Sequence, residues 1–490
     1  MKLFNLYSMA VKSNITTHTI TTIFLTFFAV IQVILNARFL GPEKLAIIAV
    51  FYMLMSIIEH FFEFGFNKAL IQKQKLDNAH VNVVFYITVL KGVLISLIIF
   101  LFSSNFENFF GVEGLSEVLV ILSLVPFIKS MRNTYAVILH RSLNFKLYGK
   151  WMISSSFFKL ICIIIGLSFY PEAISIAFAI VIAELFSTSL SYILVSNRPS
   201  IKFSYYHLVS LWNYGKWVFL AAIVAIAERQ GAQFLTVKLL SAIELSMLYI
   251  ALQFLKIPTF FSNTVKGFLF PNFSRLLSNT QKLKIYYKYG NTFLLLSFGY
   301  FLLISISLGE QLIVQLLGNE WMGIGTLFAL LVFSKIFDSF TGLDISLMNG
   351  LGYPKYAFIN HSVKATLLVV FCIAFIKSYG LIGVGLSFIL SSTISWITLR
   401  YLTLNRAAHI NAIKKLYLTI VIFVFIVSLI VFEIWNFEMV FTHDFLILFF
   451  NIIYVSSVYF LLLYLVSCVI KKTIISYEDI SIKLKEIMEL

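Results

Sequence analysis

The chain is built from long apolar runs, and this feature limits its fold more than any other. Runs of about 20 apolar residues recur along the sequence, which is the length that an α-helix needs to cross a bilayer. They lack the two-residue alternation of a transmembrane β-barrel. Hydrophobic residues make up 60% of the 490 positions and charged residues 12%. One water-soluble core cannot bury so much apolar surface, so the sequence predicts an all-α polytopic membrane protein.

The hydropathy pattern predicts about 14 transmembrane helices. Pro258 should kink the helix that contains it, because proline cannot continue the backbone hydrogen-bond ladder. The predicted spans are 18–39, 45–66, 81–103, 116–138, 151–170, 173–195, 217–239, 245–268, 291–316, 326–348, 357–377, 381–402, 416–435 and 444–469.

Positive charge alternates between the loops and predicts the orientation. If the N-terminus is cytoplasmic, the inner segments hold most of the lysine and arginine outside the spans. The outer loops hold only Lys44, Lys238 and Lys377, with Arg38 at a helix edge. The positive-inside rule then places both termini in the cytoplasm. The formal net charge of +15 is therefore mainly topological, and we expect no nucleic-acid partner.

A weak internal repeat suggests two similar halves. "RFLGPEKLAIIA" (38–49) aligns with "KLLSAIELSMLYI" (238–250), and both stretches are short outer turns between helices. Two parallel six-helix lobes are one design of secondary transporters, with the substrate site between them; two unrelated six-helix runs remain the alternative. The expected domains are an N-lobe at 1–196, a cytoplasmic linker at 197–216, a C-lobe at 217–403, two added helices at 404–470 and a cytoplasmic tail at 471–490.

Four motifs occur in an order that resembles a known family. They are "FLGPEKLAIIAVF", "FGFNKALIQKQKLD" (64–77), "LHRSLNFKLYGK" (139–150) and "GLGYPKY" (350–356). Together they resemble the Wzx-type polysaccharide and O-antigen flippases, in the polysaccharide transporter branch of the multidrug/oligosaccharidyl-lipid/polysaccharide (MOP) exporter superfamily. The resemblance implies a MATE-like bilobed bundle in a bacterial inner membrane. It also implies export of an undecaprenyl-diphosphate-linked oligosaccharide, with membrane lipids and a polysaccharide polymerase and chain-length machinery as partners.

Ionisable side chains interrupt the apolar runs. A charge at the bilayer centre costs from about 2.5 to more than 10 kcal/mol, so a set of this size requires a polar cavity. The basic members outnumber the acidic ones among the deeper positions, which favours an anionic substrate because lysine and arginine bind phosphate and carboxylate. The candidate substrate-binding residues are Lys91, Lys129, Arg132, Lys159, Arg229, Lys256, Lys335 and Lys364.

Acidic residues lie among these lysines. Glu59 and Glu63 are one helical turn apart, and Lys335 and Asp338 have the spacing of an intrahelical ion pair. Our hypothesis is that Glu59, Glu228 or Asp338 couples transport to a proton or sodium gradient. The candidates for cation coupling or ion pairing are Glu59, Glu63, Glu228, Asp338 and Asp344.

Other functions remain as alternatives. A multidrug exporter of the same superfamily binds organic cations, which a basic cavity disfavours, whereas a lipid II flippase suits the same charges. A membrane polysaccharide polymerase or ligase requires a large outer loop with catalytic residues, and no outer loop is long enough. No nucleophile–base pair, metal-ligand spacing or glycine-rich phosphate loop stands out. We therefore expect no enzyme activity, no metal site and no cofactor apart from a coupling ion.

Overall fold

The computed structural model describes residues 2–406 and 451–459, apart from 62–65, 67–69, 71–75, 141–143, 276–279, 352, 354, 454 and 458. The described residues are almost entirely helical and contain no β-strand, which confirms the predicted all-α class. The helices are α1 (Lys2–Phe61), α3 (Asn78–Leu101), α4 (Ser103–Phe110), α5 (Leu115–Leu122), α6 (Leu124–Ser130), α7 (Thr134–Val137), α8 (Phe145–Phe169), α9 (Ala173–Leu194), α10 (Tyr205–Leu239), α11 (Ala242–Phe254), α12 (Lys256–Arg275), α13 (Thr280–Leu317), α14 (Ile324–Gly350) and α15 (Lys355–Arg406). Two 3₁₀ turns, Ile138–His140 and Asn319–Trp321, complete the set.

Two of these elements each contain two predicted spans. The backbone of α1 departs from helical geometry at Gly41, with φ 68° and ψ 178°. The backbone of α15 does so at Gly380, with φ 56° and ψ −134°. Glycine tolerates these positive φ values because it has no Cβ. Each break separates a predicted pair of spans, 18–39 from 45–66 and 357–377 from 381–402.

In two further spans, a helix ends four residues before a proline. A proline ring clashes with the carbonyl of the residue four positions before it. Helix α5 ends at Leu122, four residues before Pro126, and α11 ends at Phe254, four residues before Pro258. The break predicted from Pro258 is therefore confirmed. The span predicted at 116–138 is wrong as a single helix, because α5, α6 and α7 share it.

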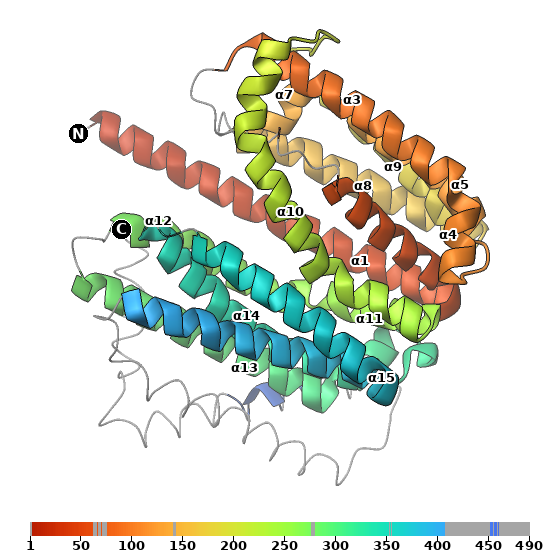
Figure 1. The fold of residues 1–490 in the computed structure, drawn as a ribbon, viewed down its shortest axis with the longest axis vertical. Coiled ribbons are helices and arrows are strands. Elements are labelled where there is room, and N and C mark those ends of the chain that lie inside the picture. Colours follow the sequence, from red (N-terminus) through yellow and green to blue (C-terminus); the bar gives the residue numbers. More distant parts are fainter. Residues whose placement is uncertain are drawn as a thin grey trace.

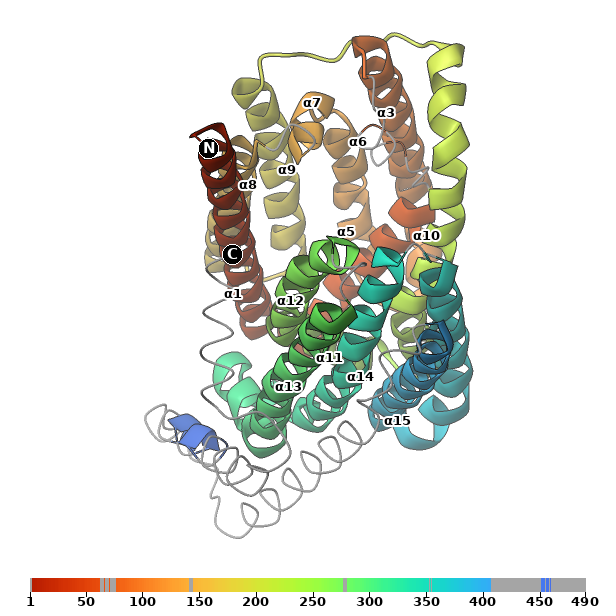
Figure 2. The ribbon, with the colours of Figure 1, turned by 90° about the vertical axis from the view of Figure 1, so that its left-hand side faces the viewer.

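The helices form two groups that meet along α1 (Figure 1). One group contains α1 and α3 to α9, and the other contains α11 to α15. Within the groups, α8 packs on α9 and α14 packs on α13 and α15. Between the groups, the kinked α1 contacts α10, α11 and α13. Helix α10 runs from beside α3 down to α15, so it belongs to both groups (Figure 2).

Part of the segment expected to connect the groups is helical. The linker was expected at 197–216, but α10 already begins at Tyr205. The extended part is held to the first group by two side chains. Asn133 donates from Nδ2 to the carbonyl of Asn197 at 2.7 Å. Asn82 accepts from the backbone N–H of Ser200 at 2.9 Å.

Several helices of the described residues have the length and composition of membrane spans. Eight of their helices are long and apolar enough to cross a bilayer, and two of these, Ile20–Glu59 and Lys355–Thr403, contain the kinks described above. The protein is a multi-pass membrane protein. Of the two added C-terminal spans, 416–435 lies outside the described residues, and 444–469 overlaps them only within 451–459.

Candidate functional site

Lys129 and Glu59 form an ion pair between α6 and α1. The Lys129 Nζ lies 2.8 Å from Glu59 Oε1 and 3.0 Å from Oε2. The lysine side chain is 42% exposed and the glutamate side chain 31% exposed. This pair joins a candidate binding residue to a candidate coupling acid, at a position that solvent or a cation can reach.

Arg132 follows α6 and forms an ion pair with Glu184 of α9. Its guanidinium also lies 5.7 Å from the ring centroid of Trp151 in α8. Both members of the ion pair are mostly buried. The sequence analysis did not single out Glu184, although a lone carboxylate inside the apolar run 173–195 was an available signal.

Lys159 of α8 begins a chain of contacts that crosses between the two groups. Its Nζ donates to the hydroxyl of Tyr52 in α1 at 3.2 Å. The Tyr52 ring stacks on Tyr249 of α11, with centroids 6.1 Å apart and planes 3° apart. A lysine of one group is thus connected through a tyrosine pair to the other group.

Lys256 lies near the same boundary. It lines a small pocket between α1 and the α11–α12 break, together with Ala29, Val30, Val33, Gln253 and Phe254. Lys159 lies within electrostatic range of Lys256. The pocket beside Lys256 therefore has largely apolar walls, and a second lysine from the other group lies within electrostatic range of Lys256. An anion between the two lysines would relieve their repulsion.

A larger charge network occupies the second group. Asp338 of α14 accepts from Lys335 at 2.7 Å and from Lys364 of α15 at 2.6 Å. Lys364 also lies 3.3 Å from Glu228 of α10. The intrahelical pair predicted from the spacing of Lys335 and Asp338 is present, but Lys364 makes it part of a three-helix network. The exposed ring of His361 contacts Glu228 through Nδ1 at 2.7 Å.

Lys266 of α12 lies within electrostatic range of Asp338. With Lys335 and Lys364 it brings three lysines around Asp338 and Glu228. Leaving His361 aside, the network carries more positive than negative charge. The sequence analysis missed Lys266 and His361, because both lie near predicted helix ends where ionisable residues are common.

Asp344 has a different environment from the other acids. It is fully buried, accepts a hydrogen bond from the Tyr287 hydroxyl and pairs with Arg400 Nη1 at 2.8 Å. The Arg400 guanidinium also lies 5.3 Å from the Tyr287 ring centroid. Of the two roles proposed for Asp344, this arrangement fits ion pairing, with Arg400, near the end of the predicted span 381–402, as the partner.

The remaining candidates are dispersed. Lys91 is half-buried on α3. Arg229 is exposed, whereas its neighbour Glu228 is partly buried in the network. Glu63 lies outside the described residues. The structure therefore does not gather the predicted residues into one site. Lys129 and Arg132 form separate ion pairs in the first group, and Lys159 and Lys256 lie at the boundary between the groups. The network of Lys335, Asp338, Lys364 and Glu228 lies in the second group.

Comparison with known families identifies the chain. A family model described as "Polysaccharide biosynthesis protein" matches residues 34–325, which is more than half of the sequence. The chain belongs to this family. This polysaccharide biosynthesis protein is also similar to the lipopolysaccharide biosynthesis protein WzxC of Escherichia coli K12, at 19% identity over 382 residues that cover 77% of each chain. The resemblance recognised in the sequence is confirmed.

Solved structures establish the fold of this polysaccharide biosynthesis protein. The lipid II flippase MurJ in an inward closed conformation matches with a TM-score of 0.71 and 15% identity, over 91% of this chain and 98% of its own. An inward-facing MATE family multidrug resistance transporter of the MOP superfamily matches with a TM-score of 0.67 and 15% identity, over 80% and 95%. The predicted MATE-like fold is confirmed. These relatives are transporters and flippases, not enzymes.

Proposed function

We propose that this protein translocates an undecaprenyl-diphosphate-linked oligosaccharide across the bacterial cytoplasmic membrane. The proposal places both termini in the cytoplasm, as the distribution of lysine and arginine predicts. Membership of the polysaccharide biosynthesis family supports the substrate class. The oligosaccharide is a repeat unit of O-antigen, capsule or another surface polysaccharide. The polymerase and chain-length machinery would use the product on the opposite side.

One observation carries the proposal: Lys256 lines a small, largely apolar pocket at the boundary, within electrostatic range of Lys159 from the other group. A lipid-linked sugar has an anionic diphosphate next to an apolar chain, and these two parts require different surroundings. Ammonium groups attract the diphosphate most strongly where water is scarce. The apolar walls formed by Val30, Val33 and Phe254 suit the adjoining lipid. An organic cation would meet repulsion from both lysines.

Alternating access gives this arrangement a mechanism. The pocket lies where α1 meets α11 and α12, so separation of the groups would widen it on one side. The Tyr52–Tyr249 stack crosses the same boundary and has to part during opening. The kink at Gly41 and the break before Pro258 offer places where α1 and the α11–α12 pair can bend.

Cation coupling uses the acids of the clusters. Glu59 is exposed enough for a proton or sodium ion to compete with Lys129 for its carboxylate. Glu228 and Asp338 hold Lys364 in the same way on the other side of the boundary. Neutralising such an acid frees its lysine for the diphosphate, which would link ion binding to substrate binding.

The decisive experiment is deletion of the gene in its host. Surface polysaccharide and undecaprenyl-diphosphate-linked repeat units in the inner membrane are then quantified by mass spectrometry. We expect loss of surface glycan and accumulation of complete, unpolymerised lipid-linked units, whose mass identifies the substrate. Normal glycan without accumulation, in a strain that has no second flippase, would overturn the proposal. Accumulation of lipid II instead would reassign the substrate to the cell-wall precursor.

A further inference from the structure

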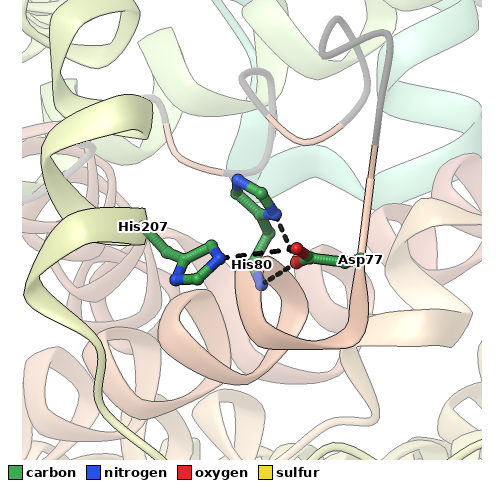
Figure 3. A group of neighbouring side chains, drawn as sticks. All are labelled: Asp77, His80 and His207. Carbon is green, nitrogen blue, oxygen red and sulfur yellow. Dashed lines mark hydrogen bonds and ion pairs between the residues drawn. The ribbon is translucent and has the colours of Figure 1, made fainter.

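Three side chains outside the charge clusters meet where α3 and α10 begin (Figure 3). They are Asp77, which precedes α3, His80 in its first turn and His207 in the first turn of α10. One ligand atom of each residue lies within 4.8 Å of those of the other two. Asp77 Oδ1 is 2.5 Å from His80 Nδ1, and Asp77 Oδ2 is 3.4 Å from His207 Nε2.

The backbone fixes two of these groups in place. Asp77 has an extended conformation and caps α3 by accepting from the His80 backbone N–H at 3.0 Å. The carboxylate is therefore directed along the first turn of α3. Its position follows from helix capping and does not depend on any ligand.

His207 is oriented by a second hydrogen bond. Its Nδ1 lies 2.7 Å from the hydroxyl of Ser204, the residue that precedes α10. When Nδ1 donates to this hydroxyl, the lone pair of Nε2 faces Asp77. Metal-ligating histidines commonly have their second ring nitrogen held by such a partner. The His80 and His207 rings meet edge to face with centroids 4.5 Å apart.

We propose that Asp77, His80 and His207 bind a divalent transition-metal ion of the zinc type. Two imidazole nitrogens and one carboxylate oxygen form a donor set typical of Zn²⁺, with a fourth position left for water. The His80 side chain is 8% exposed, His207 is 20% exposed and Asp77 is 59% exposed, so the ion can enter from the carboxylate side. The ion replaces the proton shared by His80 and Asp77, and the ligand atoms move apart to accommodate it.

The proposed metal would connect the first helix group to the start of α10. Asp77 caps α3 and His80 lies in its first turn, whereas His207 belongs to the helix that runs on to α15. The site lies at the end of the bundle that the positive-inside rule predicts to be cytoplasmic. Spacing in the sequence does not reveal it, because His207 is far from the other two ligands along the chain. Occupancy would hold α10 against α3, independently of the proposed substrate.

The test uses the full-length protein in detergent after removal of metals with a chelator. Binding of Zn²⁺ is measured by calorimetry, and the ligands are identified by electron paramagnetic resonance with Cu²⁺ as the probe. We expect one high-affinity ion per chain and coupling to imidazole nitrogens in the Cu²⁺ spectrum. His80→Ala and His207→Ala should each abolish that site. Ser204→Ala should weaken it about 10- to 100-fold, because the orienting hydrogen bond is lost.

Asn82→Ala is the matched control. Asn82 also joins α3 to the segment before α10, by accepting from Ser200, but its amide is no metal ligand of this site. The Asn82→Ala variant should bind Zn²⁺ with the same affinity as the unaltered protein. Asp77→Asn keeps an oxygen that can cap α3, so it separates loss of the ligand charge from loss of the fold. Absence of stoichiometric binding, or binding unchanged in both histidine variants, would show a hydrogen-bonded triad only and overturn the proposal.

Discussion

Tyr52 and Tyr249 stack across the boundary between the two helix groups, with their ring planes parallel to within 3°. The first belongs to α1 and the second to α11, and the Tyr52 hydroxyl accepts from Lys159. Tyr249 is almost fully buried, at 8% exposure. The stack therefore joins a candidate substrate-binding lysine to the boundary that opens in the proposed mechanism.

The tyrosine stack should contribute measurably to stability. Aromatic pairs contribute about 0.5–1.5 kcal/mol beyond the burial of their area. A double-mutant cycle of Tyr52→Leu and Tyr249→Leu should show a coupling of this size in the free energy of unfolding, measured by denaturation in mixed micelles. Tyr52→Phe is the control, because it keeps the ring and loses only the hydroxyl. Additive effects of the two leucine variants would mean that the rings do not stabilise each other.

The two boundary lysines should be required for export. A hydrogen bond to a charged group contributes about 1.5–3 kcal/mol, so Lys159→Met or Lys256→Met should weaken substrate binding by about tenfold or more. Surface glycan in a complemented deletion strain reports the effect. Lys44→Met is the matched control, because Lys44 forms an exposed ion pair with Glu172 away from the pocket. Equal glycan in all three strains would exclude these lysines from the binding site.

Asp338 should be essential for folding stability. Breaking a buried ion pair by removing one partner costs about 3–5 kcal/mol, because the other charge is left without compensation. Asp338→Asn should therefore lower the thermal unfolding temperature, measured by intrinsic fluorescence in detergent. Adding Lys335→Met should restore part of the lost unfolding temperature, because it removes the lysine that is left without a partner. Lys364 keeps Glu228 as a partner. An unchanged unfolding temperature in Asp338→Asn would show that the network is hydrated and weak.

Glu59 should matter for coupling more than for stability. Its pair with Lys129 is partly exposed, and such pairs contribute less than about 1 kcal/mol. Glu59→Gln should leave the unfolding temperature nearly unchanged but alter the dependence of transport on pH or sodium. Glu172→Gln, in the exposed pair with Lys44, is the control. If Glu59→Gln transports with the same ion dependence as the unaltered protein, this acid has no coupling role.

The glycine kinks should differ in their tolerance of a side chain. At both Gly41 and Gly380 an alanine would be strained by a positive φ, at a cost of about 1–3 kcal/mol. A Cβ on Gly41 would also lie 2.5 Å from a carboxylate oxygen of Glu320, whereas a Cβ on Gly380 would meet nothing within 4 Å. Gly41→Ala should therefore be the more destabilising change in thermal unfolding, by a small margin, because the flexible side chain of Glu320 can turn away. A larger loss for Gly380→Ala would contradict this assignment of the strain.

The sequence by itself determined the class of the protein and most of its helices. Apolar runs of bilayer length are a local property, and so are the effects of proline and glycine on the backbone. For this reason the spans, the break before Pro258 and the pair of Lys335 with Asp338 could be predicted. The span predicted at 116–138 is not a single helix, because Pro126 lies inside it and α5 ends at Leu122.

Only the tertiary structure decided which charges meet. Arg132 pairs with Glu184, and Asp344 pairs with Arg400, although each pair comes from separate helices. Asp77 and His80 likewise meet His207 only because α10 begins beside α3. Helical periodicity determines which residues share a face of one helix, but it does not determine which helix packs against that face. Partners of membrane-embedded charges depend on this packing, because a long side chain pairs with whatever opposite charge the neighbouring helix brings within reach.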